Sequence, residues 1–404
     1  MKKTIITCFF AAFSFLFAAS QKHTSSYSSN ENGMHSIIIN DDNGSLEIKF
    51  TGDISFTDDE TAIKTISPEG YLKFKKNGKK LVVTSKENGE LVYEINDGDK
   101  KNTLTADEKT FLAEAVKMMI EYGVGAKDRV ERIYKKSGSK AVMEEAKNMK
   151  SDFVKSIYLD YLLETNTLSQ SEMTEIANNV HFLLSSDFEK GKLLKKFSSK
   201  YLANPATADA YLSAVKSISS DFEKANAVKE ILKQSLTKEQ FTQVMEVANS
   251  INSDFEKANV LKEVVGNNKI SPAQFSEVLK ATSHITSDFE KANVLKQILH
   301  NDKLPEGQFL ETLSVITSVQ SDFEKANVLK QLAGSGIKEE SHWISLIGST
   351  EKVSSDFEKG NVLRDIAARM PASENVRSAY LKAAKTISSD FEYGKAIRSI
   401  KEAN

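Results

Sequence analysis

The chain has 404 residues, with 54 basic and 56 acidic side chains, a formal net charge of −2 and a hydrophobic content of 40%. Charges of both signs alternate along it, so neither nucleic acid nor an anionic membrane surface is expected as the main partner. The single cysteine, Cys8, excludes a disulfide-rich fold, and a chain of this length can be stabilised by packed cores alone.

The first twenty residues, 1–20, are typical of a cleaved secretory signal peptide. Lys2 and Lys3 precede an apolar run over 5–19, and small residues at 18–20 suit cleavage before Gln21. The cysteine lies inside the apolar run, so no lipid attachment is predicted. We therefore expect an exported protein, periplasmic or secreted, that has no stable membrane anchor after cleavage because no later run of about 18 apolar residues exists.

A flexible linker is predicted over 21–35, because this stretch is rich in Ser, Asn and His and poor in apolar residues. Residues 36–103 have the pattern of a small antiparallel β domain. Leu46, Ile48 and Phe50 alternate with polar residues, as strands with one covered face do. Pairs that favour tight hairpin turns recur at Asn43-Gly44, Asn77-Gly78, Asn88-Gly89 and Asp97-Gly98.

Connecting helices are predicted over 104–138. Thr105 and Glu108 have the spacing of a capping box, which opens a helix able to cover the apolar face of the sheet. A second helix is expected over roughly 126–136, ending at Gly138. The residues expected to face inward from the first helix are Phe111, Leu112, Ala115, Met118 and Met119.

From 139 to 404 the chain repeats a motif related to Ser-Asp-Phe-Glu-Lys. Its eight aspartates are separated by 33–35 residues and are Asp152, Asp187, Asp221, Asp254, Asp288, Asp322, Asp356 and Asp390. A period of this length indicates stacked helix pairs, each burying the apolar face of its neighbour. The predicted fold class is α+β: an N-terminal antiparallel β domain followed by an all-α solenoid of about eight αα-hairpin repeats, similar to HEAT repeats.

The motif lies where the second helix of each repeat begins, and its serine is predicted to be the N-cap. The seven serine caps are Ser186, Ser220, Ser253, Ser287, Ser321, Ser355 and Ser389. We expect each glutamate to return the hydrogen bond and each aspartate only to complement the helix dipole, so that losing the aspartate costs less than losing the serine. The alternative is a ladder of carboxylates, Asp221 to Asp390, that binds cations or a basic ligand. The phenylalanine and the following Ala or Gly are expected to form the core stripe.

Two further columns of side chains repeat. Asparagines at the edge of the buried stripe are expected to hydrogen-bond the adjacent repeat. For the basic column two interpretations remain open: salt bridges to the neighbouring repeat, or recognition of an acidic partner. The asparagines are Asn226, Asn259, Asn293, Asn327 and Asn361, and the candidate partner-binding basic residues are Lys229, Lys262, Lys296, Lys330 and Arg364, with Lys195 and Arg398 at the ends of the column.

No catalytic residue, metal site or cofactor site is predicted. Six histidines are scattered without a partner at metal-ligand spacing, and there is no H-E-x-x-H, no G-x-S-x-G and no phosphate-binding glycine-rich loop. The run Asp41-Asp42-Asn43-Gly44 has the wrong register for a calcium loop. Trp343, the lone tryptophan, is either a core residue or a binding hot spot.

The stretch GDISFTDDETAIKTISPEGYLKF (52–74), a following helix, the segment GVGAKDRVERIY (123–134) and the Ser-Asp-Phe repeats carry a further resemblance. Together they are similar to the extracytoplasmic tail of some bacterial antirepressor-type membrane zinc metallopeptidases. The chain lacks the zinc motif and membrane helices of such proteins, so the resemblance implies a free-standing sensing or partner-binding module and no peptidase chemistry.

The leading hypothesis is an exported, non-catalytic interaction protein, a scaffold or sensor-type module that binds a protein partner through the solenoid surface. A structural or adhesive component of the cell envelope is the alternative from a different class. A hydrolase without a recognisable motif is a remote third.

Overall fold

The computed structural model describes residues 24–30, 33–42, 44–165, 167–267, 270–300, 304 and 306–402. The first of its two units runs to Glu172 and includes Phe182–Ser185, and the second contains Met173–His181 and the residues from Ser186 onward. The predicted signal peptide lies outside the described residues. None of the helices in the described ranges is both long and apolar enough to cross a membrane.

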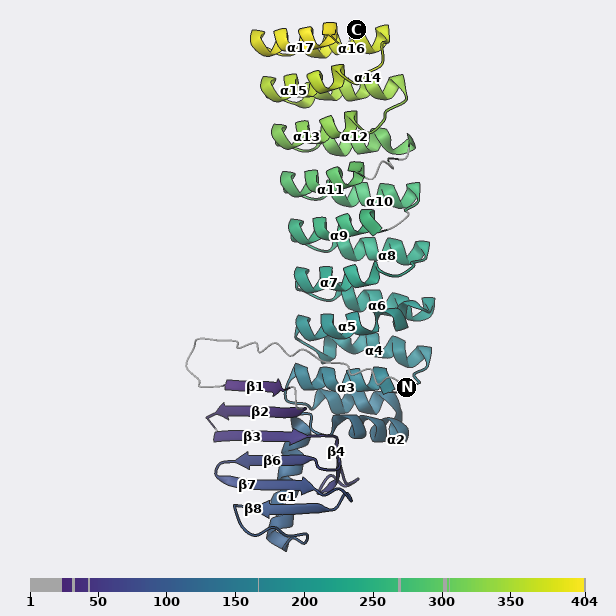
Figure 1. Ribbon diagram of the computed structural model, residues 1–404. Coiled ribbons are helices and arrows are strands. Elements are labelled where there is room, and N and C mark those ends of the chain that lie inside the picture. The colour runs from purple at the N-terminus through teal and green to yellow at the C-terminus, as the bar shows by residue number, and fades with distance from the viewer. Residues whose placement is uncertain are drawn as a thin grey trace. The chain divides into compact units, whose positions relative to one another are not determined.

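An antiparallel sheet of six strands, in the order β1-β2-β3-β6-β7-β8, forms the base of the first unit, and β4 and β5 pair separately (Figure 1). Ile37, Ile48, Phe74 and Leu81 pair in register across four strands and make one continuous apolar row. The strands are β1 Thr24–Ser29, β2 Met34–Asp41, β3 Gly44–Thr51, β4 Ile54–Phe56, β5 Ile63–Ile66, β6 Tyr71–Lys76, β7 Lys79–Ser85 and β8 Leu91–Ile95.

The helix α1, Ala106–Glu121, packs on this apolar row, as the capping box and its apolar spacing predicted. Thr105 caps it, and the reciprocal bond from Glu108 is present. Leu112, Ala115 and Met119 are buried in the same cluster as the strand residues, together with Val116 and Ile120. Phe111 and Met118 lie at the margin of this core, so the helix is turned slightly from the expected orientation.

Strand β1 corrects the prediction of a flexible linker over 21–35. Residues 24–29 pair with β2 along their whole length, from Thr24 opposite Asn40 to Ser29 opposite His35. The segment is polar because an edge strand is held by backbone hydrogen bonds and needs few apolar side chains. Its one large residue, Tyr27, packs against the core. The β domain therefore begins at Thr24 and not at 36.

Two local predictions from glycine are confirmed. Asn77 and Gly78 connect β6 to β7 with φ values of 49° and 86°, the left-handed geometry of a tight hairpin turn. In helix α2, Ala126–Lys147, the backbone leaves the helical conformation at Gly138, where φ is 76° and ψ is −175°. The part of α2 after Gly138 is the first helix of the first repeat.

The repeats are helix pairs, which we call A and B in chain order. In the second unit, the B helices pack on one another in one row and the A helices in a second row (Figure 1). The A helices after α2 are α4 Gln170–Leu183, α6 Pro205–Lys216, α8 Lys238–Asn249, α10 Pro272–Ser283, α12 Phe309–Thr317, α14 Glu340–Ser349 and α16 Glu374–Ala384. The B helices are α3 Asp152–Thr165, α5 Asp187–Leu202, α7 Asp221–Ile231, α9 Asp254–Asn267, α11 Asp288–His300, α13 Asp322–Ala333, α15 Asp356–Ala367 and α17 Asp390–Glu402.

Short 3-10 turns, η1 Glu306–Gln308 and η2 Thr350–Lys352, flank α12 and α14. Small and aliphatic residues of the B helices, such as Ala258 and Leu261, are fully buried between the rows. The architecture is therefore α+β with a helical solenoid, which confirms the predicted fold class.

Candidate binding surface

The motif serines cap the B helices. The side chain of each of the seven, from Ser186 to Ser389, accepts a hydrogen bond from the backbone N–H of the glutamate three residues on, at 3.3–3.4 Å. This bond satisfies one of the free donors at a helix start. The serine thus acts within its own repeat.

The aspartates have a different partner from the one expected. From Ser220 onward, the backbone N–H of each motif serine donates to the aspartate of the preceding motif, at 2.7–2.8 Å. The prediction was that this N–H would donate to the glutamate of its own motif. The residue before the serine also donates; Thr286, for example, donates to Asp254 through both its N–H and its hydroxyl. The six aspartates from Asp187 to Asp356 therefore each hold the next B helix against their own. Their carboxylates are used within the array, which argues against the alternative of a carboxylate ladder that binds cations or a basic ligand.

These bonds shift the aspartate titration. Burial alone raises the pKa of Asp254, but the hydrogen bonds from Thr286 and Ser287 outweigh it and lower the pKa below its ordinary value. Asp187 and Asp322 are shifted in the same direction for the same reasons. A lowered pKa in the folded chain means that the stabilisation is complete above the ordinary pKa of an aspartate, about 3.9, and disappears as the pH falls through the lower folded value.

The thermal midpoint should therefore fall steeply below about pH 4, where the unfolded chain takes up protons before the folded chain does. Circular dichroism melts between pH 7 and pH 3 measure this, with Asp254→Asn as the comparison. Because the variant lacks one such carboxylate, the difference between its midpoint and that of the wild type should narrow as the pH falls. A difference that stays constant across the range would contradict the assignment.

In three repeats the motif lysine joins the two rows of helices. Its stem is buried, and its ammonium group donates to carbonyl oxygens at the C-terminal end of the next A helix: Lys224 to Ser250, Lys325 to Lys352 and Lys359 to Thr386, at 2.8–3.4 Å. A cation at that end complements the helix dipole. These three lysines therefore also hold neighbouring helices together.

Some residues of the basic column form salt bridges to the neighbouring repeat, and others remain candidates for recognition of an acidic partner. Three of its residues pair with a motif glutamate of the next repeat, and these pairs are Lys229 with Glu256 at 3.8 Å, Lys296 with Glu324 at 2.8 Å and Arg364 with Glu392 at 2.9 Å. Lys262 and Lys330 form no ion pair with any described residue. These two lysines remain available to an acidic group on a partner.

The motif phenylalanines are not in the core, which corrects the predicted core stripe. In all seven B helices from α5 to α17 the side chain is 56–65% exposed. The reason is the helical position: each phenylalanine lies four residues before the asparagine or lysine and seven before the basic residue, so it shares their surface face. The exposed phenylalanines are Phe188, Phe222, Phe255, Phe289, Phe323, Phe357 and Phe391, which we call the phenylalanine column.

The asparagines are also placed differently from the prediction. They are half-buried, and the amides of Asn226, Asn259, Asn293 and Asn327 make no hydrogen bond to another described residue. Only Asn361 has a partner there, the guanidinium of Arg364. The expected bond to the adjacent repeat is therefore absent among the described residues.

A shallow depression of about 540 Å³ shows how these columns share one surface. It lies over α5 and α7 and is lined by Phe188, Lys192, Lys195, Lys196, Glu223 and Glu230. Burial raises the pKa of Glu223 despite the nearby Lys195. Aromatic, basic and acidic side chains thus meet at the same place on the B-helix face.

Trp343 does not contribute to this surface. It is 4% exposed in α14, and its indole N–H donates to the carbonyl of Ile337 at 3.2 Å. The candidate hot spot is therefore a core residue, because its large ring fills the space between helices. Its neighbour His342 stacks on Phe309 with 4.2 Å between ring centroids. Among the described residues, no group of three or more His, Cys, Asp or Glu is placed to hold a metal ion.

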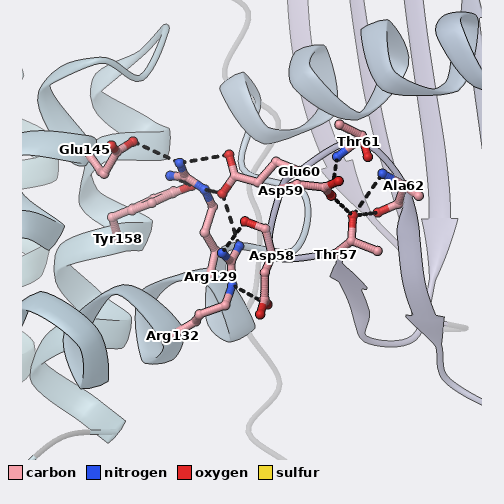
Figure 2. A network of polar contacts seen from close by, with 10 residues as sticks. All are labelled: Thr57, Asp58, Asp59, Glu60, Thr61, Ala62, Arg129, Arg132, Glu145 and Tyr158. Carbon is pink, nitrogen blue, oxygen red and sulfur yellow. Dashed lines mark hydrogen bonds and ion pairs between the residues drawn. The ribbon is translucent and has the colours of Figure 1, made fainter.

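A second polar cluster lies in the first unit, around Arg129 (Figure 2). The guanidinium, 7% exposed, donates to Glu60 through Nε and Nη2 at 2.7 and 3.2 Å, to Glu145 at 2.9 Å and to the hydroxyl of Tyr158 at 3.2 Å. Burial alone lowers the pKa of Arg129, but the two carboxylates raise it above its usual value. Arg132 adds a second bond to Glu60, at 3.1 Å.

This cluster fixes a loop. Glu60 lies between β4 and β5 with a positive φ of 56°, and the arginines of α2 hold it there. The same loop is closed by Thr57, whose hydroxyl donates to Asp59 at 2.6 Å. Because the charges are used within the chain, the B-helix face remains the stronger candidate for binding.

No family model matches the sequence, and no curated protein matches it. A solved structure described as "Computational Design of Self-Assembling Cyclic Protein Homooligomers" is similar over 69% of this chain and 93% of its own, with 13% identity and a TM-score of 0.13. A score that low carries no argument about fold or function.

Proposed function

We propose that this chain is an exported, non-catalytic interaction protein that captures a protein partner on the B-helix face of its solenoid. The phenylalanine column carries the proposal. Exposed aromatic side chains gathered on one face of a protein are typical of interaction surfaces, and aromatic residues supply much of the binding energy at such surfaces. The Lys2-Lys3 start and the apolar run over 5–19 support export.

The motif itself gives the reason for choosing phenylalanine. Serine, aspartate, glutamate and lysine make bonds within the array, whereas the phenylalanine side chain is mostly exposed. A large apolar side chain repeated at a mostly exposed position contributes little to folding. Its repetition is explained if a partner covers the column.

Changing Phe255, Phe289 and Phe323 together to Ser should reduce retention of the partner at least tenfold, because burying one such side chain contributes about 1.5–3 kcal/mol. The thermal midpoint should stay within about 2 °C, since these side chains are mostly exposed. Quantitative pull-down from envelope extracts, followed by a dissociation constant for the captured protein, measures both effects.

Leu310→Ser is the matched control, because Leu310 is equally exposed but lies on an A helix. It should leave retention unchanged. Bulk binding to wall glycans that the triple substitution does not affect would instead favour the envelope structural or adhesive component. The resemblance to metallopeptidase tails suggests a sensor-type role, which the same capture experiment addresses through the identity of the partner.

A further inference from the structure

Five consecutive repeats share one surface unit, a phenylalanine followed four residues later by an asparagine. Both side chains lie on the same face of the B helix. The five pairs are Phe222 with Asn226, Phe255 with Asn259, Phe289 with Asn293, Phe323 with Asn327 and Phe357 with Asn361. The repeats on either side have lysine in place of asparagine, and Lys395 lies over the ring of Phe391 at 3.9 Å. The five Phe–Asn pairs therefore form one patch, which ends on both sides where lysine replaces asparagine.

The asparagine amides indicate what covers the patch. Four of them make no hydrogen bond within the described part of the chain, although they are half-buried. An amide offers both donors and an acceptor, and covering it without a partner costs free energy. The ligand must therefore present polar groups beside its apolar side chains. An extended backbone does so, whereas the backbone of an α-helix is already hydrogen-bonded within itself.

The spacing of the units selects the kind of extended chain. Packed helices are about 8–10 Å apart. A polyproline II helix presents the same face every three residues, a rise of about 9.3 Å, and its backbone has no internal hydrogen bonds. A β-strand presents the same face every two residues, about 6.6 Å, and its third residue faces the opposite side. An α-helix repeats its face after seven residues, about 10.5 Å.

In the first copy of the motif, the phenylalanine contacts an aromatic side chain from a strand of the same chain. Phe153 is half-buried, and the ring of Tyr27 in strand β1 lies 4.9 Å from it, tilted by 50°. This copy has Ile157 at the asparagine position, so it lacks the polar half of the unit. An extended chain bearing one aromatic residue is thus a compatible occupant for this ring.

From these observations we infer that the five Phe–Asn units bind an extended, proline-rich segment of the partner in the polyproline II conformation. An apolar side chain at every third residue packs on each phenylalanine, and backbone carbonyls accept from the asparagine amides. Lys262 and Lys330 favour an acidic residue in the same segment. Five units correspond to about 13 ligand residues. The inference rests on the proposed function and specifies its partner.

Selection of a random 15-residue peptide library for binding to the mature chain tests this inference. Peptides that also bind the variant with Phe255→Ser, Phe289→Ser and Phe323→Ser are removed by counter-selection. Enriched peptides should be rich in proline and carry apolar residues at a period of three. A synthetic peptide of the enriched sequence, followed by fluorescence anisotropy, then gives the dissociation constant. A shuffled peptide of the same composition should bind at least tenfold more weakly.

Changing Asn259, Asn293 and Asn327 together to Ala should also weaken binding at least tenfold, since three hydrogen bonds to the ligand are lost. Leu310→Ser should not change it. Enrichment of peptides with a heptad or two-residue period, or no enrichment, would overturn the inference. If the phenylalanine changes still abolish capture of the native partner in that case, the proposed function survives; if capture is also unaffected, both are wrong.

Discussion

Replacing Arg129 with Ala should lower the free energy of unfolding of the first unit by about 3 kcal/mol. The change removes the cation shared by Glu60 and Glu145, and breaking a buried ion pair is strongly destabilising. Glu145 loses this partner, and Glu60 keeps only Arg132. Both carboxylates are about a third exposed, which keeps the effect at the lower end of the range for buried pairs. The hydroxyl of Tyr158 also loses its donor.

Hydrogen exchange of the loop between β4 and β5 and of α2, together with circular dichroism melts, measures the loss. Arg132→Ala is the matched control and should cost less than about 1 kcal/mol, because Arg132 is more exposed and Glu60 keeps Arg129. Arg129→Met keeps the apolar stem and removes the charge, so it should destabilise nearly as much as alanine. If Arg129→Met is as stable as the wild type, the packing of the side-chain stem and not its charge is what Arg129 contributes to stability.

Replacing Asp254 with Ala should destabilise the repeats by about 2–3 kcal/mol, because the bonds from Thr286 and Ser287 share one partly exposed carboxylate and together contribute about as much as one strong bond to a charged acceptor. Ser253→Ala should cost about 1 kcal/mol, the usual effect of losing an N-cap. This order reverses the expectation from the sequence, where the aspartate was assigned only to the helix dipole. The reversal follows from the bonds to Thr286 and Ser287 in the next repeat.

Urea unfolding followed by the fluorescence of Trp343 gives both values, since this tryptophan is buried within the second unit. Asp390→Ala is the control. Asp390 has the same position in the last motif, is exposed and accepts no hydrogen bond from a described residue of another repeat, so its loss should cost less than about 0.5 kcal/mol. Equal effects of Asp254→Ala and Asp390→Ala would show that the bonds between repeats contribute little.

The sequence by itself determined the elements and their order. A period near 34 residues requires stacked units, and the caps at Thr105 and the motif serines mark where helices begin, because these signals act within a few residues of the chain. Asn77-Gly78 specified its turn and Gly138 its kink for the same local reason. The prediction was wrong at 24–29, where an edge strand is held by backbone pairing that leaves no pattern in its side chains.

Only the tertiary structure decided what the motif residues contact. Asp254 bonds a residue 33 positions later, and the neighbour of a surface side chain on the next repeat cannot be read from the spacing within one helix. The exposure of the phenylalanine column could have been foreseen from Asn four residues on and Lys seven on, which mark the surface face. Hydrophobicity pointed to the core instead, because burial depends on which face meets a neighbouring helix and not on the residue type alone.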